Sequence, residues 1–307
     1  MTTLILHHDD CLRHTAGLRH VERPERVNAV LGAVDILPGT EVLPAPRASE
    51  AQLMAAHAAD YWLRIVDLEP GTEDEERIVA LDADTFLSPG SVDATLRGSG
   101  AACFAVDQVA AGKARNAFCV VRPPGHHAER AAAMGCCFFK NIAVGAAHAL
   151  THYGLQRIAI VDFDVHHGNG TEDIFHNEPR VLFCSSFQHP FFPHSDIGAP
   201  GAHMIKTPLD AGTGSLTFRE RVGAEWLERL DAFEPELLMI SAGFDAHWQD
   251  DLADLNLNER DYGWLTGELR ELADRHAGGR IISVLEGGYV LPALARSVAA
   301  HLDALLG

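Results

Sequence analysis

Short apolar runs that alternate with longer segments of helical periodicity constrain the fold of this chain more than any other feature of its sequence. Six runs have the length and composition of buried strands: Leu4–Leu6, Ala117–Val121, Ile158–Phe163, Val181–Cys184, Leu237–Ile240 and Ile281–Leu285. Seven segments between and after them have the periodicity of helices: Glu25–Ile36, Glu50–Val66, Ser91–Ala111, Ile142–Tyr153, Phe218–Leu230, Arg260–His276 and Leu291–Leu306. Strands and helices that alternate in this way are typical of an α/β fold with a parallel sheet.

The 307 residues contain no fixed-period repeat, low-complexity tract or linker that would divide them. The stretch rich in glycine and proline at Phe192–Gly214 is better explained as a long functional loop than as a domain boundary. With 47% hydrophobic residues, a chain of this length is able to bury a large core. We therefore expect residues 1–307 to form a single domain.

The charge of the chain argues against some classes of partner. There are 43 Asp and Glu against 24 Lys and Arg, a net charge of −19, and no basic stripe to hold nucleic acid. No apolar run approaches the ~18 residues of a membrane helix, and the N-terminus lacks the basic region of a signal peptide. These features predict a cytoplasmic protein without a nucleic-acid or membrane partner, favour a cationic substrate, and leave open whether the chain is a homo-oligomer.

Four of the predicted strands run directly into polar segments that carry chemistry. These segments are residues 122–127, 162–170, 241–247 and 286–289. Because the carboxyl ends of parallel strands meet at one edge of a sheet, where α/β proteins bind ligands, we expect the four segments to build one site.

The second of these segments has the pattern of a metal chelate. Asp162, Asp164 and His166 alternate in an extended stretch and therefore point to one side. Asp164 and His166 can chelate one divalent ion, and Asp245 is the natural third ligand for a catalytic zinc. An isolated aspartate after a strand often caps the next helix instead, but the full Asp-x-Asp-x-His-His pattern favours the metal site.

Two adjacent histidines and one tyrosine are candidates for the catalytic groups. His126 and His127 can supply a general base and an electrostatic partner. Asp162 and Asn169 are available to orient their rings. Seen alone, paired loop histidines are more often solvated than catalytic, but opposite a metal motif we favour catalysis. Tyr289 follows two glycines and could hydrogen-bond an oxyanion or simply pack, so the residues alone leave its role open.

In their order and spacing, these segments resemble the zinc-dependent histone deacetylase family of amidohydrolases, most closely its class II and bacterial members. The similarity runs from Cys11 through Arg23–Arg26 to Tyr289, nearly the whole chain. The resemblance implies the arginase/deacetylase fold, with a central parallel sheet of about eight strands and helices on both faces, forming one catalytic domain.

The resemblance also implies roles for the site residues. One zinc ion per chain would be held by Asp164, His166 and Asp245. His127 would be the general base and would later protonate the leaving amine. Tyr289 would bind the carbonyl oxygen and then the oxyanion.

The remaining implied roles support these groups. His126 would stabilise charge, with Asp162 behind it, and Asn169 would stand behind His127. Arg26 would lie near an internal cavity through which the acyl product leaves. A structural potassium ion would lie near a set of neighbouring residues: Asp162, Asp164, His166, Ser186 and Phe187.

The expected substrate-binding residues depart from the family pattern. Relatives usually have phenylalanine where this chain has Cys136, opposite Phe192, so we expect a wider tunnel on that side. Gly135 and Gly287 are further expected substrate-binding positions. Leu252 occupies the place where polyamine-specific relatives carry an acidic residue, which leans away from a dedicated polyamine enzyme.

We therefore expect zinc-dependent removal of acetyl or other acyl groups from N-acylated amines such as acetyl-lysine. Acetylpolyamines or other small amides are alternative substrates, and the acidic run at residues 73–76 could attract a cationic one. A dinuclear manganese ureohydrolase is a rival, although residues 168–170 offer no second acidic ligand after His166. A non-catalytic acyl-binding module is another rival, and Fe(II) can compete with zinc at such a site.

Overall fold

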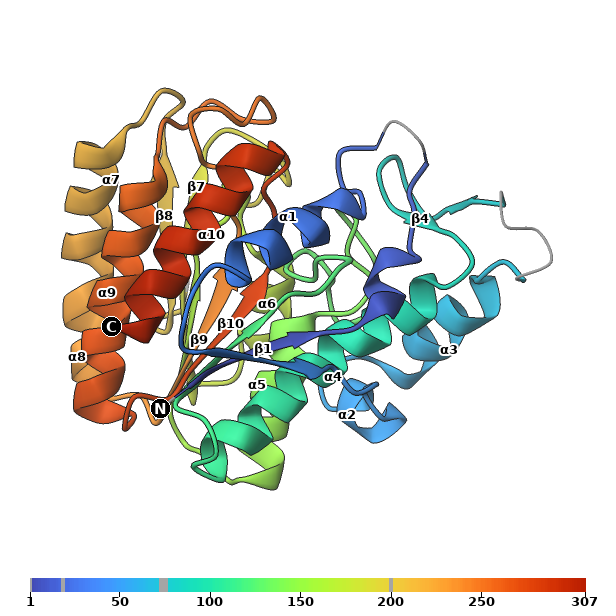
Figure 1. Cartoon of the computed structure of the whole chain (residues 1–307), viewed down its shortest axis with the longest axis horizontal. Coiled ribbons are helices and arrows are strands. Elements are labelled where there is room, and N and C mark those ends of the chain that lie inside the picture. The colour runs from blue at the N-terminus through green and yellow to red at the C-terminus, as the bar shows by residue number, and fades with distance from the viewer. Residues whose placement is uncertain (1, 18–19, 72–76, 199–200) are drawn as a thin grey trace.

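The computed structural model describes residues 2–17, 20–71, 77–198 and 201–307. Within these residues the chain forms an eight-stranded sheet in which every neighbouring pair is parallel (Figure 1). In spatial order the strands are β2 (Thr40–Pro44), β1 (Thr3–His7), β5 (Asn116–Cys119), β10 (Ile281–Leu285), β9 (Leu237–Ala242), β6 (Ile158–Asp162), β7 (Val181–Gln188) and β8 (Met204–Leu209). The predicted α/β class and the number of strands are confirmed. A small antiparallel pair, β3 (Val79–Ala80) and β4 (Phe86–Leu87), lies outside this sheet.

Helices cover both faces of the sheet. On one face lie α2 (Glu50–Met54), α3 (Ala59–Leu68), α4 (Ser91–Ala110) and α5 (Asn141–His152). On the other lie α1 (Glu25–Val34), α7 (Ser215–Val222), α8 (Glu228–Phe233), α9 (Glu259–His276) and α10 (Leu291–Leu306). The short α6 (Asn169–Phe175) follows β6, and a 3-10 turn (Asp9–Leu12) follows β1.

The strands are apolar on both sides because each side of the sheet is a core. In β6, Ile158 and Ile160 pack on the α4–α5 side, whereas Ala159 and Val161 pack on the α9–α10 side. This two-sided burial explains why the central strands read as continuous apolar runs rather than as alternating ones. It also leaves the strand ends as the place where polar side chains emerge.

Three predicted boundaries were wrong. The helix expected at Glu50–Val66 is two helices, with buried His57 in the turn between them. His57 Nδ1 lies 3.1 Å from the backbone oxygen of Glu129, and its Nε2 accepts from the Lys140 N–H at 2.9 Å. The helix expected at Phe218–Leu230 extends from residue 215 to 233 through a π-helical turn (Gly223–Leu227). The stretch expected to be a loop at Phe192–Gly214 contains β8.

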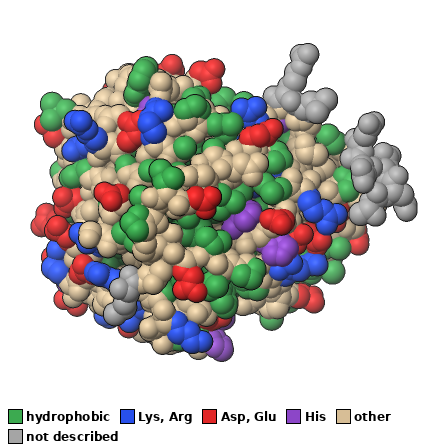
Figure 2. All heavy atoms as spheres, viewed as in Figure 1, with side chains coloured by type: hydrophobic (Ala, Val, Ile, Leu, Met, Phe, Trp, Pro, Cys, Tyr) green, Lys and Arg blue, Asp and Glu red, His purple; other side chains and the backbone are tan. Residues whose placement is uncertain are grey.

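The structure also bears on two expectations about partners, that the chain has no membrane helix and no basic stripe for nucleic acid. Among the described residues, none of the helices combines the length and the hydropathy needed to cross a membrane. On the face in Figure 2, Lys and Arg side chains are scattered among acidic ones and do not gather into one basic patch.

Candidate active site

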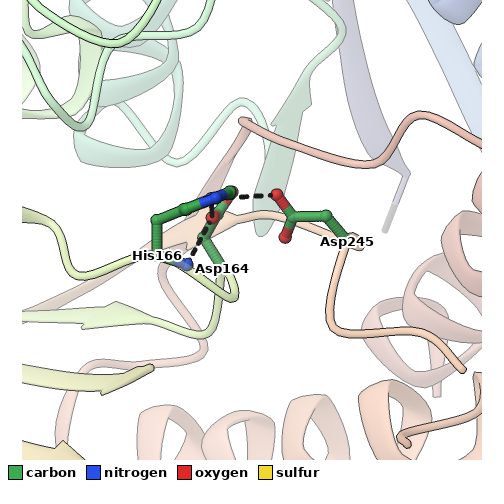
Figure 3. Close-up of side chains that lie close together, drawn as sticks. All are labelled: Asp164, His166 and Asp245. Carbon is green, nitrogen blue, oxygen red and sulfur yellow. Dashed lines mark hydrogen bonds and ion pairs between the residues drawn. The ribbon is translucent and has the colours of Figure 1, made fainter. Parts of the chain in front are cut away.

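Three potential metal ligands converge at the carboxyl edge of the sheet. Asp164 and His166 follow β6, and Asp245 follows β9, which is hydrogen-bonded to β6. Their ligand atoms lie within 4.8 Å of one another, and dashed lines in Figure 3 connect His166 to both carboxylates. His166 Nδ1 is 2.9 Å from Asp164 Oδ1 and 3.3 Å from Asp245 Oδ2.

This group has the chemistry of a divalent cation site. Asp164 and Asp245 are each 1% exposed, and burial together with the charge of Asp164 raises the pKa of Asp245 to about 6. Among the described residues, Asp245 Oδ2 has no hydrogen-bond partner. Two buried carboxylates this close together repel each other unless a cation lies between them, and the neighbouring imidazole nitrogen is a further ligand for a divalent ion.

Glycines let the backbone approach these carboxylates closely. A Cβ on Gly243 would lie 2.0 Å from Asp164 Oδ2, and one on Gly287 would lie 2.1 Å from Asp245 Oδ2. The Gly287 N–H donates to Asp164 Oδ2 at 2.9 Å. The structure therefore places Gly287, expected among the substrate-binding residues, against the metal-ligand group.

His126 is held by carboxylates and is charged near neutral pH. It follows β5, and its Nδ1–H donates to Asp162 Oδ2 at 3.1 Å, while its Nε2 is 3.7 Å from Asp164 Oδ1. Burial alone would lower its pKa, but the charges of Asp164 and Asp162 and the hydrogen bond to Asp162 raise the pKa to about 9.

His127 is held by an amide and is neutral. Its ring lies 4.0 Å from that of His126, and its Nδ1 is 2.8 Å from Asn169 Oδ1. The Asn169 Nδ2 donates to Glu129 Oε1 at 2.9 Å, so Oδ1 faces the ring and His127 Nδ1 carries the proton. Burial and the neighbouring His126 and His166 hold the pKa of His127 well below its usual value. The lone pair of Nε2 is then free to accept a proton.

Two buried charged residues, Asp250 and Arg26, hold Tyr289 in place. Its backbone N–H donates to Asp250 Oδ2 at 2.7 Å. The Arg26 guanidinium lies 4.9 Å from the centre of the Tyr289 ring, and it donates to the backbone oxygen of Gly288 at 2.7 Å. Arg26 is paired in turn with buried Glu22 at 3.1 Å.

These groups line one pocket of about 330 Å³. Its wall is formed by His20, Val21, Asp84, Pro124, His126, His127, Gly135, Cys136, His166, Phe192, Leu252 and Tyr289. The Phe192 ring stands edge-on to that of His127, with centroids 5.1 Å apart. A Cβ at position 135 would lie 2.4 Å from His127 Cδ2, so only glycine fits beside the imidazole.

The Cys136 side of this pocket is closed by a loop. The backbone of Cys136 has φ 65°. Its N–H donates to Thr85 Oγ1 at 3.1 Å, and its thiol donates to the backbone carbonyl oxygen of Asp84 at 3.2 Å. The half-buried Asp84 carboxyl belongs to this loop and has its pKa raised by burial and by Asp82.

The structure thus brings most of the sequence-predicted site residues together. Ser186 and Phe187 lie on β7, beside β6, and the acidic run at 73–76 lies outside the described residues. The residues that sequence reasoning did not assign are Asp84, His20, Glu22, Asp250 and Glu286. Two of these had a signal in the sequence: Glu286 opens the strand-end segment 286–289, and Asp250 lies three residues beyond the segment 241–247.

An all-parallel sheet with two acids, three histidines and a tyrosine at its carboxyl edge is the arrangement of the arginase/deacetylase fold. A solved structure described as the HDA15 HD domain aligns with 100% of this chain and 90% of its own, at a TM-score of 0.89 and 28% identity. The predicted fold class is confirmed by this match.

Sequence comparison agrees with the fold. The histone deacetylase domain model matches residues 20–305. The chain is 36% identical to a histone deacetylase-like amidohydrolase of Pseudomonas aeruginosa, over 89% of this chain and 73% of the relative. It is 37% identical to the polyamine deacetylase HDAC10 of Mus musculus, over 94% of this chain and 45% of the relative. Across eight of the relatives that it matches, the chain spans from 20% to 99% of the relative's length.

The chain belongs to the histone deacetylase family. Its relatives are named as deacetylases and amidohydrolases, and the chain is a hydrolase of this kind, acting on amide bonds.

Proposed function

We propose that this protein is a zinc-dependent amidohydrolase that removes acetyl or other acyl groups from N-acylated amines such as acetyl-lysine. The observation that carries the proposal is that His166 of the Asp-His-Asp group lines one pocket with two adjacent histidines that have different partners, one a carboxylate and one an amide. This pairing leaves one neutral imidazole, which can act as a general base beside the metal-ligand group.

Asp164, His166 and Asp245 would hold one zinc ion. Their oxygen and nitrogen donors suit this ion, and three protein ligands leave a position open for a reactant. When bound, zinc would polarise the acyl carbonyl and make the attacking water more acidic. We further propose a structural potassium ion near Asp162 and Ser186, and a single catalytic domain over residues 1–307.

The residues of the chain then supply the proton transfers. His127, neutral and with a free Nε2, accepts the proton of the attacking water and afterwards gives it to the leaving amine. His126, kept positive by Asp162, stabilises the negative charge that develops beside it. The Tyr289 hydroxyl would donate a hydrogen bond to the carbonyl oxygen as it becomes an oxyanion.

A specific observation favours acylated polyamines as a second class of substrate. Asp84 contributes a carboxyl to the pocket wall, and a second amino group of a polyamine is a cation that a carboxyl can bind. The match to a polyamine deacetylase agrees with this, whereas the apolar Leu252 in the wall offers no second acid.

The two rival functions find less support. A dinuclear site needs further bridging carboxylates, and the described residues contain one group of three potential ligands. A purely binding module has no need of an oriented neutral histidine beside a charged one.

The experiment that tests the proposal measures turnover of metal-quantified protein. The panel holds acetyl-lysine peptides, acetylated polyamines and longer acyl-lysines, with a hydroxamate as inhibitor control. We expect hydroxamate-sensitive hydrolysis with one zinc per chain. Two metal ions per chain would favour the ureohydrolase, and a silent panel with zinc bound would favour the binding module.

A further inference from the structure

The peptide unit that joins Gly288 to Tyr289 is held on both sides by buried charged groups. Its oxygen accepts a hydrogen bond from Arg26 Nε at 2.7 Å, and its N–H donates to Asp250 Oδ2 at 2.7 Å. Arg26 has no exposed surface and Asp250 is 4% exposed, so water competes little for either contact. Because a peptide is planar, two contacts on opposite sides fix its orientation, and with it the direction in which the Tyr289 side chain leaves the backbone.

The backbone before Tyr289 has no side chains of its own to hold it. Gly288 has φ 114°, and a Cβ there would lie 3.0 Å from Leu294 Cδ1 and 3.1 Å from Phe244 Cβ, so only glycine fits. Asp250 Oδ2 also lies 3.4 Å from the N–H of Val290, the residue before α10, where the helix dipole favours a negative charge. The Asp250 carboxylate therefore fixes the end of a loop that two glycines leave free to move.

The other oxygen of the same carboxylate holds a wall of the pocket. Asp250 Oδ1 accepts from the Leu252 N–H at 3.3 Å, and both Leu252 and Tyr289 line the pocket. The backbone N–H of Asp250 donates to the His247 oxygen at 2.8 Å, which anchors the carboxylate on the segment that follows Asp245. The position of Leu252 relative to Tyr289 is thus set by one side chain.

We propose that Asp250 is a positioning residue that couples the two sides of the pocket: it keeps the Tyr289 hydroxyl in reach of the reacting carbonyl and the Leu252 wall against the substrate stem. The inference rests on the proposed function and deepens it. Asp250 acts on kcat through Tyr289 and on KM through Leu252. Its effect on kcat cannot exceed that of the hydroxyl that it positions, on the order of 10²- to 10³-fold.

The test is a double-mutant cycle with Asp250→Leu, Tyr289→Phe and the double variant. Leucine has the branched shape of aspartate but accepts no hydrogen bond. We expect Asp250→Leu to lower kcat on the order of 10- to 10²-fold, because the hydroxyl is misplaced, and to raise KM about tenfold, because an apolar contact is lost. In the Tyr289→Phe background no hydroxyl remains to be positioned, so the same change should leave kcat unaltered and still raise KM.

Two control variants separate positioning from other effects. Asp251→Leu makes the same change one residue further on, where the side chain is exposed, and should leave kcat and KM near wild-type values. Asp261→Asn removes the charge of a fully buried carboxylate on α9 that is paired with Arg219 at 2.8 Å. We expect Asp261→Asn to lower the melting temperature without lowering kcat. A merely structural role for Asp250 would lower kcat by the same factor in both backgrounds of the cycle.

Amide hydrogen exchange at Leu252 and Tyr289 reads the two contacts without catalysis. We expect faster exchange at both amides in Asp250→Leu than in the wild type or in Asp261→Asn. Unchanged exchange at Tyr289, or an equal loss of kcat with and without the hydroxyl, would overturn the positioning of Tyr289, and an unchanged KM would overturn that of Leu252.

A conservative variant keeps the test decisive. Asp250→Asn retains one acceptor oxygen, so we expect it to recover part of what Asp250→Leu loses, and it takes the place of that variant in the cycle if leucine prevents folding. Wild-type kcat and KM together in Asp250→Asn, with unchanged exchange at both amides, would then overturn the proposal. If the wild type hydrolyses no acyl amide, the proposed function fails while the exchange measurement still tests what Asp250 holds.

Discussion

Replacing Asn169 by aspartate would give His127 the kind of partner that His126 already has. At present Asn169 Oδ1 lies 2.8 Å from His127 Nδ1, and this neutral acceptor favours the charged imidazole less than a carboxylate would. A carboxylate at about 4 Å from an imidazolium contributes about 4 kcal/mol at an effective dielectric constant of about 20. This corresponds to about three pKa units, the upper end of the usual range of about one to three. We expect the pKa of His127 to rise.

The neighbouring Glu129 determines how much of this rise is realised. Glu129 Oε1 accepts a hydrogen bond from Asn169 Nδ2 at 2.9 Å, and an aspartate at 169 would place a second oxygen against it. The two carboxyls would repel each other, so the new one would be partly protonated. Glu129→Gln supplies an amide that can donate in place of Nδ2. The double variant Asn169→Asp/Glu129→Gln should therefore show the larger rise.

The assay is kcat/KM against pH for zinc-loaded protein. A base must be unprotonated to accept a proton, so a higher pKa of His127 moves the acidic limb of the profile to higher pH, by about one to three units in the double variant. The control Asn256→Asp adds the same charge at an exposed position and should leave the limb in place. An acidic limb that stays in place, or moves to lower pH, would refute the assignment of His127 as the base.

Three further changes have clear expected results. Tyr289→Phe should lower kcat on the order of 10²- to 10³-fold with zinc content unchanged, measured by turnover and metal analysis, because it removes one oxyanion donor. Asp245→Asn should lower zinc affinity, measured by competition with a chelator, since one anionic ligand is lost. Burial is the main reason that the pKa of His57 is lowered to about 4. The folded state therefore favours the neutral form of His57, and its contribution to the free energy of unfolding is fully present above about pH 6.5. This contribution is lost as the pH falls toward 4. Denaturant unfolding should show this loss, and His57→Gln should reduce it; an identical pH dependence in the variant would assign the loss to other groups.

The central strands and the helices that cover them could be predicted because burial on both sides leaves an unmistakable apolar run. The edge strands could not. Thr40–Pro44 in β2 is largely exposed, and Met204–Leu209 in β8 contains Lys206 and Pro208, so neither reads as a buried strand. Lys206 fits because its Nζ reaches Glu172 at 2.8 Å, a contact that spacing along the chain does not reveal.

The site was predictable where a motif directly follows a strand. It was not predictable where a residue supports the site through contacts with a distant segment. Asp164, His166 and Asp245 converge because neighbouring parallel strands end at one edge. Glu286 looked like part of the turn before Tyr289, since nothing in the sequence shows that its carboxylate reaches across to the loop after β5.

If Cys136 stands where relatives have the expected tunnel phenylalanine, it changes the polarity of the wall as well as its width. The sequence alone predicts only missing volume. In the structure the thiol and the N–H of Cys136 bind the segment around Asp84 and Thr85, which closes that side of the pocket. A phenylalanine at 136 would have no thiol to donate to the backbone oxygen of Asp84. Phe192 presents an aromatic ring to the same pocket, edge-on to His127. A pocket wall with both an aromatic ring and a carboxyl favours an aliphatic stem that carries a cation over a purely apolar chain.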